Sequence, residues 1–241
     1  MCDDPHVTSS GEAATEALAP QAAGETSIGE SRWPPALALL AFLGLNIGLR
    51  IWLPHERATR VPWLVPAIEG VLLVLLLLGH PGRLARRTPW LRRVALAFVI
   101  LLVLAALWAT ATLVYDLIEG TGVSNKPSEL LATGALVWLG NNLAFGLLYW
   151  LMDGGGPIAR SRNPTPIDFA FTQQMSPELA PRGWRPVFLD YLHLGFTNAT
   201  AFSPTDVMPL THRAKYAMLV QSTVALALIG LVVARAVNAF T

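Results

Sequence analysis

The chain has 241 residues, of which 53% are hydrophobic and 14% are charged, and its formal net charge is +1 at pH 7. Soluble domains carry about 25% charged residues, so this composition predicts an integral membrane protein. A net charge so close to zero gives no sign of nucleic-acid binding, and the single cysteine, Cys2, excludes a disulfide within the chain.

Residues 1–33 differ in composition from the rest of the chain. They are rich in Ala, Gly, Ser, Thr and Glu, and Arg32 is their one basic residue against six acids. They lack the basic start and the apolar centre of a signal peptide. We therefore predict a disordered acidic tail. The bias of the whole chain towards Arg over Lys favours a bacterial source.

Five apolar runs follow the tail, and each is long enough for a helix that crosses a bilayer core of about 30 Å at a rise of about 1.5 Å per residue. Five such runs are not expected in the core of a soluble protein of this length. They predict a four-helix transmembrane region at residues 34–152 and a fifth span near the end of the chain. In chain order the runs cover residues 34–53, 61–79, 94–115, 130–152 and 216–234.

The segment between the fourth and fifth runs is polar and contains many prolines. Residues 153–186 contain "DGGGP" and six prolines, which predicts a loop rather than a span. The next residues, "VFLDYLHLGFTNATAFS", are helical in pattern but carry an acid, a histidine and several hydroxyls. Such a segment survives at membrane depth only inside protein or beside water. We therefore predict an all-α fold of five spans, with a re-entrant helix or a short sixth span within residues 187–241.

Two kinds of polar residue interrupt the apolar runs. Glu69 lies inside the second run, where an acid costs roughly 2.5–3.5 kcal/mol and each apolar neighbour returns about 0.3–0.6 kcal/mol, so the helix can still insert. This carboxylate either faces the bundle interior as a functional group, or lies shallow and pairs with Arg60. Asn46, Asn141 and Asn142 are expected to hydrogen-bond across helix contacts.

Asp190, His193 and Thr197 are spaced so that one helix face carries all three. This face either hydrogen-bonds against the bundle, or relays protons or binds an ion. Further metal ligands are absent nearby, and the chain has no HExxH, GxSxG or Walker A motif. We therefore expect no metal, no cofactor and no enzymatic activity.

The order of short helix, hydroxyl-rich segment, Asp-x-x-Pro and membrane helix resembles the pore unit of two-helix potassium channels. The resemblance implies an outer helix at residues 130–152, a pore helix at "YLHLGFTNAT" and a pore-lining inner helix at 216–234. The motif "TDVMP" then stands where those channels have Gly-Asp-x-x-Pro. The whole chain also resembles an uncharacterised bacterial membrane protein family in which "YW-x-x-D-x-GGP" recurs with "TNATAFSPTD".

The filter position departs from that pattern. Potassium channels stack the carbonyls of Thr-Val-Gly-Tyr-Gly around the ion. Here neither glycine is present, and a proline fixes φ near −65° and removes an N–H. The resemblance therefore implies a pore without a standard potassium filter. Its filter-like residues are Thr200, Ala201, Phe202, Ser203, Pro204, Thr205 and Asp206.

Two functions are compatible with these features. In the first, a homo-oligomer, by resemblance a tetramer, passes a small ion or polar solute, with Asp206 attracting cations at the mouth. In the second, a non-conducting scaffold or sensor keeps the channel-like fold, and residues 203–206 cap the start of a helix. Either way the partners are the lipid bilayer and further copies of the chain, and we expect a multi-pass protein of the bacterial inner membrane.

The orientation in the membrane is predicted differently by the charges and by the resemblance. Five arginines lie between the second and third runs, which places that loop and the N-terminus in the cytoplasm. A pore loop that enters from outside, as in potassium channels, requires the N-terminus outside. The charge pattern favours a cytoplasmic N-terminus.

Overall fold

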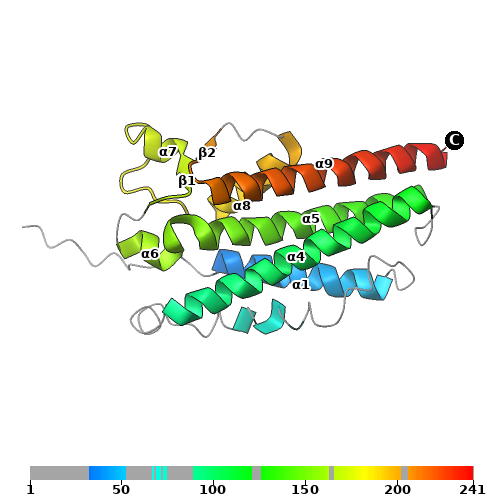
Figure 1. Ribbon diagram of the computed structural model, residues 1–241, viewed down its shortest axis with the longest axis horizontal. Helices are drawn as coiled ribbons and strands as arrows, with labels where there is room; N and C mark the ends of the chain where they lie inside the picture. The colour runs from blue at the N-terminus through cyan, green and yellow to red at the C-terminus, as the bar shows by residue number, and fades with distance from the viewer. Residues whose placement is uncertain are drawn as a thin grey trace, which may run out of the picture.

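The computed structural model describes residues 33–52, 67, 69–71, 73–74, 89–120, 126–162, 166–201 and 206–240 (Figure 1). This part of the chain is mostly helical. Its four long helices are α1 (Trp33–Trp52), α4 (Pro89–Glu119), α5 (Pro127–Met152) and α9 (His212–Phe240).

Three of these helices are long and apolar enough to cross a membrane. The qualifying stretches are Arg92–Glu119, Pro127–Gly155 and His212–Asn238, while the apolar part of α1, Trp33–Gly48, is shorter. The sequence therefore predicted correctly that these three runs form membrane-type helices. Of the predicted second span, residues 67, 69–71 and 73–74 are helical, and the rest lies outside the described residues.

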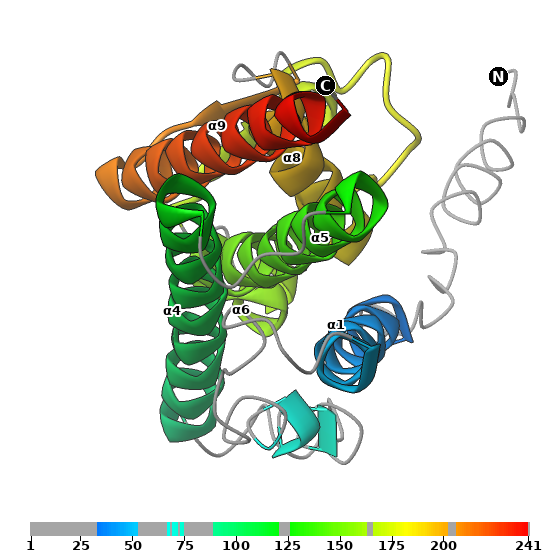
Figure 2. The same cartoon turned by 90° about the vertical axis from the view of Figure 1, so that its right-hand side faces the viewer.

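Helix α5 is the centre of the bundle. It contacts α1, α4, α8 and α9, and 61% of its apolar stretch is buried, against 28% for α4 and for α9. Seen along the bundle, α5 lies between α1, α4 and α9 (Figure 2). A glycine permits a close contact between α5 and α8, because a Cβ at Gly146 would meet the Leu192 backbone at 3.3 Å.

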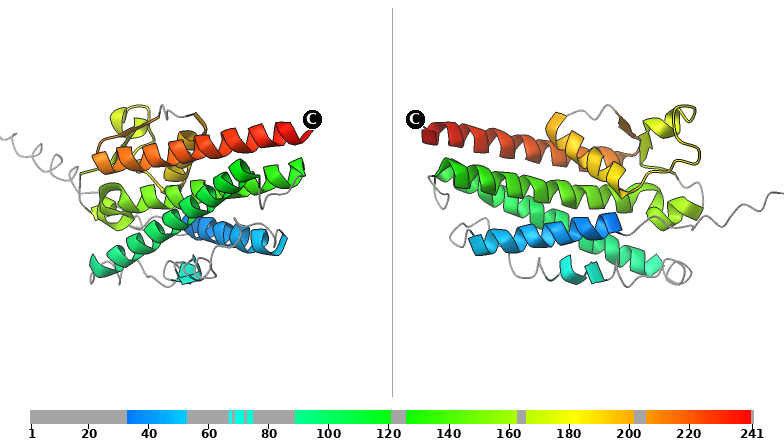
Figure 3. Two further views of the ribbon diagram at one scale, coloured as in Figure 1. Left: turned by 45° about the vertical axis from the view of Figure 1, so that its right-hand side comes forward. Right: turned by 180° about the vertical axis from the view of Figure 1, so that it is seen from behind.

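The bundle has two different ends. At one end the α4 residue Arg92 lies against Gly155 just after α5, and at the other Arg235 of α9 lies against Gly120 just after α4. Helices α4 and α9 therefore run in the same direction and α5 runs in the opposite direction (Figure 3). We call the first end the ribbon end, because a β-ribbon lies there, and the second the far end.

Residues 153–211 fold at the ribbon end. In chain order they form η3 (Asp153–Gly155), α6 (Pro157–Arg162), β1 (Phe169–Phe171), α7 (Thr172–Met175), α8 (Phe188–Ala201) and β2 (Val207–Pro209). The two strands pair in antiparallel fashion with Phe169 opposite Pro209 and Phe171 opposite Val207. The chain therefore leaves the ribbon at β1 and returns to it at β2, and α8 lies between these two points.

The ribbon corrects three predictions. The fold is not all-α, because two strands of the chain pair, and the predicted loop at 153–186 contains short helices and a strand. Asp206 and the Asp-x-x-Pro motif do not begin the last helix, because Val207–Pro209 is a strand and α9 starts at His212. The helix-cap interpretation of Asp206 is therefore wrong. Pairing with β1 outweighs the preference of Asp206 for the start of a helix, because the pairing satisfies the backbone N–H and C=O groups of this short segment.

Candidate functional site

Many of the described polar residues gather around helix α8. Asp190 lies in its first turn and accepts a hydrogen bond from the Val187 backbone N–H at 2.7 Å. This is the contact that the acid of a capping box makes, and a negative charge is favourable at this helix end. Asp190 therefore stabilises the start of α8.

One face of α8 joins a buried network of neutral groups with α5 and α9, which we call the interior network. The Tyr149 hydroxyl and the Asn198 amide both donate to Gln221 Oε1, at 2.7 and 2.8 Å. Gln221 Nε2 in turn donates to the Gly195 carbonyl at 2.9 Å, and lies 3.4 Å from Asn142 Oδ1. All five residues are buried, and none carries a charged group.

The interior network lies deep within the bundle. Gln221 is nine residues beyond the start of α9 and Asn142 is thirteen before Gly155, which correspond to about 14 and 20 Å along a helix. A bilayer core is about 30 Å thick, so these residues lie well inside helices that could cross it.

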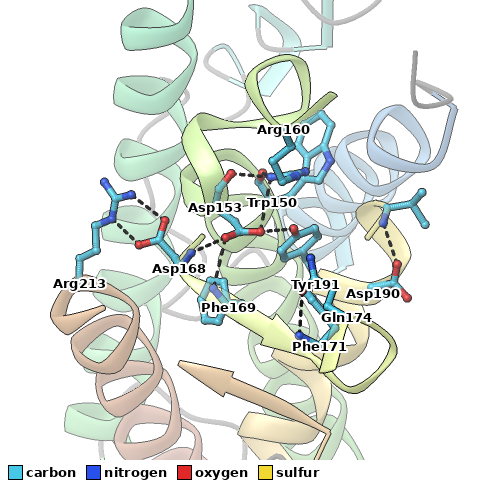
Figure 4. Close-up of polar contacts among 11 residues, drawn as sticks. Trp150, Asp153, Arg160, Asp168, Phe169, Phe171, Gln174, Asp190, Tyr191 and Arg213 are labelled. Carbon is cyan, nitrogen blue, oxygen red and sulfur yellow. Dashed lines mark hydrogen bonds and ion pairs between the residues drawn. The ribbon is translucent and has the colours of Figure 1, made fainter. Parts of the chain in front are cut away.

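A second buried network, the end network, lies at the ribbon end and contains charges (Figure 4). Asp153 Oδ1 accepts from the backbone N–H groups of Asp168 and Phe169, at 2.6 and 3.2 Å. Asp153 Oδ2 accepts from the Tyr191 hydroxyl of α8 at 2.5 Å. Arg160 donates to the Asp153 carbonyl at 2.7 Å, and its guanidinium lies 4.9 Å from the Tyr191 ring centre. Asp153 thus joins the end of α5 to β1 and to α8.

The second carboxylate of the end network, Asp168, joins β1 to the start of α9. Arg213 donates to both of its oxygens at 2.6 Å, and the Thr211 hydroxyl donates at 2.5 Å. The Asp168 side chain is fully buried, whereas Arg213 is 59% exposed. Such two-pronged pairing offsets the cost of burying a carboxylate. The two networks together hold α8 at both of its ends.

The opposite face of α8 is exposed and carries polar residues, with Leu189 and Phe196 exposed beside them. His193, Thr197 and Thr200 follow one another at helical spacing, and His193 Nε2 lies 3.5 Å from Asp206 Oδ2. The His193 and Asp206 side chains are 61% and 56% exposed. Each threonine hydroxyl donates to a carbonyl of α8, at 3.0 Å for Thr197 and 2.9 Å for Thr200. We call these four residues the polar face.

The structure thus separates the residues that the sequence singled out. His193, Thr197 and Thr200 share the polar face with Asp206, while Asp190 caps the helix. The Ala201 side chain and residues 202–205, which include Phe202, Ser203, Pro204 and Thr205, lie outside the described residues.

Glu69 lies elsewhere, buried beside α1. Its Oε1 accepts a hydrogen bond from the Asn46 amide at 2.8 Å. The predicted alternative partner, Arg60, lies outside the described residues. Asn141 bonds to Thr110 of α4 at 2.6 Å, which is the cross-helix contact expected of it.

Sequence reasoning did not identify the residues that hold α8. Asp153 stands in "DGGGP", which indicated only a loop, and Asp168 stands in "DFAF". Gln221 stands inside an uncharged run, where an amide is a signal of buried hydrogen bonding. Asn198 is part of "TNAT", whose hydroxyls drew attention to the exposed face instead.

Among the side chains that the structure describes, no group of three or more His, Cys, Asp and Glu residues is placed to hold a metal ion. Comparison of the chain with protein-family models, with curated proteins and with solved structures finds no match. A functional proposal therefore depends on the geometry of α8 and its surroundings.

Proposed function

We propose that the chain is a five-span membrane protein in which α8 is a re-entrant helix, and that a homo-oligomer passes a small cation along the polar face of α8. One observation supports this most strongly. The inner face of α8 bonds to residues about 14–20 Å inside the bundle, while its outer face exposes His193 and Asp206.

Lipid is a poor environment for that outer face. An imidazole, a carboxylate and hydroxyls at membrane depth normally face protein or a water-filled cavity. A single chain supplies one such face and does not enclose it. Several copies around a common axis enclose the faces in a water-filled path, and the resemblance to potassium channels favours four copies.

The chemistry of the polar face suits a cation. The hydroxyl protons of Thr197 and Thr200 point to helix carbonyls, so that oxygen lone pairs remain for an ion. Asp206 adds a negative charge at the end of this path, which raises the local cation concentration. Oxygen groups of this kind replace the hydration water of a permeating cation.

Flux through proteoliposomes tests the proposal. In a Cys2→Ser background, the variant Thr200→Cys is treated with a positively charged thiol reagent, and Leu104→Cys, 55% exposed on the apolar surface of α4, is the matched control. We expect cation flux above that of empty vesicles. The thiol reagent should remove most of the flux of Thr200→Cys and leave that of Leu104→Cys unchanged. No flux of monovalent cations, anions or protons would contradict the proposal.

A second function, a non-conducting scaffold or sensor, is favoured by a different observation. The polar groups of α8 have partners within one chain, because the threonine hydroxyls bond to their own helix and His193 pairs with Asp206. A stable monomer in mild detergent, together with no flux, would support this alternative.

A further inference from the structure

The two ends of the bundle differ strongly in positive charge. At the far end, the described side chains include two basic residues, Lys126 before α5 and Arg235 in the last turns of α9. At the ribbon end, the described side chains include seven basic residues. These are Arg92, Arg93, Arg160, Arg182, Arg185, Arg213 and Lys215.

Several contacts show that these seven residues share one end. Arg92 lies against Gly155 after α5, Arg213 bonds to Asp168 before β1, and Trp184, between the two loop arginines, packs on Phe171. The flanking sequence leaves the difference unchanged, because three arginines come within six residues before α4 (Arg83, Arg86 and Arg87) and three lie at or after the end of α1 (Arg50, Arg57 and Arg60).

The difference persists when the basic residues of the end network and of the Lys126–Glu129 pair are left out. Arg160 and Arg213 bond within the end network, and Lys126 pairs with Glu129. Five basic residues then remain at the ribbon end and one at the far end among the described side chains. Acidic residues contribute little to membrane orientation, so the acids at both ends do not alter this comparison.

We propose that the ribbon end faces the cytoplasm and that α8 enters the membrane from the cytoplasmic side. Loops and helix ends rich in Lys and Arg stay in the cytoplasm during insertion, where the anionic leaflet also attracts them. Because the chain leaves and rejoins the same ribbon at β1 and β2, residues 172–206 both begin and finish on that side.

This orientation is opposite to that of the potassium-channel pore unit, whose filter segment enters from outside. It rests on charge and helix direction, and it holds whether or not the protein conducts. Combined with the proposed function, it places Asp206 at a mouth that opens to the cytoplasm, so the cation would be collected from that side.

Thiol accessibility in a bacterial host tests the orientation. The full chain with Cys2→Ser receives one cysteine, either Leu179→Cys after α7 or Lys126→Cys before α5. Both positions are well exposed, at 85% for Leu179 and 75% for the Lys126 side chain, so neither substitution removes a packed side chain. A membrane-impermeant maleimide is added to intact spheroplasts and, separately, after permeabilisation.

We expect Lys126→Cys to react in intact spheroplasts, and Leu179→Cys to react at least tenfold less until the membrane is permeabilised. Any other pattern, above all labelling of Leu179→Cys from outside, would overturn the orientation.

Discussion

The interior network and the end network hold the same helix with different chemistry. Inside the bundle, Gln221 collects bonds from a phenol and an amide, and no member is charged. At the ribbon end, Asp153 and Asp168 are as fully buried, yet both carry carboxylates, and Arg160 and Arg213 lie beside them. Burial alone therefore does not determine whether a network contains charged or neutral groups.

We attribute the difference to the depth of each network in the membrane. An ionised group costs most at the middle of a membrane and much less near its surface, where headgroups and water lie close. Charge-assisted bonds are stronger than neutral ones, so they are used where the charge can be tolerated. We infer that α8 is fixed firmly at the surface and held by weaker, neutral bonds at depth.

The largest effect is expected from removing the carboxylate of Asp153. Asp153→Ala leaves two backbone N–H groups and the Tyr191 hydroxyl without their acceptor in a buried site. We expect a loss of about 3–5 kcal/mol in the free energy of unfolding, as for other broken buried charge networks. Thermal unfolding in mild detergent measures this loss. Asp153→Asn keeps one acceptor oxygen, so its stability should lie between those of the parent and Asp153→Ala. Stability equal to the parent would show that the end network does not hold the fold.

Placing a charge in the interior network tests the role of depth. Gln221→Glu preserves size and one acceptor oxygen, but an acid at the centre of a membrane helix costs roughly 2.5–3.5 kcal/mol. The same detergent assay should show a loss of this order, with Gln221→Met as the control for the lost hydrogen bonds alone. If Gln221→Glu unfolds at the parent temperature, the interior is wet and the contrast between the networks fails.

Two tyrosines sharpen the comparison with one substitution each. Tyr191 donates to a carboxylate and Tyr149 donates to an amide, and both rings are fully buried. Hydrogen bonds to charged groups contribute about 1.5–3 kcal/mol and neutral ones about 0.5–1.5 kcal/mol. Tyr191→Phe should therefore lower the unfolding temperature more than Tyr149→Phe, and the reverse order would contradict the assignment of charge to the end network.

The smallest effect is expected at the exposed ion pair of the far end. Lys126 lies 3.0 Å from Glu129, with side-chain exposures of 75% and 38%. Exposed pairs at this helical spacing contribute about 0.2–0.5 kcal/mol. Lys126→Ala should leave the unfolding temperature nearly unchanged, whereas Arg213→Ala, which leaves the buried Asp168 without its cation, should lower it clearly.

The helices were predictable because long apolar runs have few alternatives. The runs at 94–115, 130–152 and 216–234 lie inside α4, α5 and α9, and the segment before the last helix forms α8. The β-ribbon was not predictable, since three-residue strands carry no periodic signal and β1 pairs with residues nearly forty positions away.

The candidate site was predictable only in part. Helical spacing placed His193 and Thr197 on one face, because that property is local. The partners of Asp153 come from β1, α6 and α8, and those of Gln221 come from α5 and α8, so no local pattern reveals them. The pairing of His193 with Asp206 likewise depends on β2, which returns Asp206 to the base of α8.

The mass of the protein particle in native-like lipid nanodiscs tests the proposed pore most directly, because one copy of α8 cannot enclose its polar face. We predict an assembly of four chains, extracted without prior exposure to harsh detergent. A particle containing one copy of the 26.0 kDa chain would contradict the pore and leave the scaffold as the better interpretation.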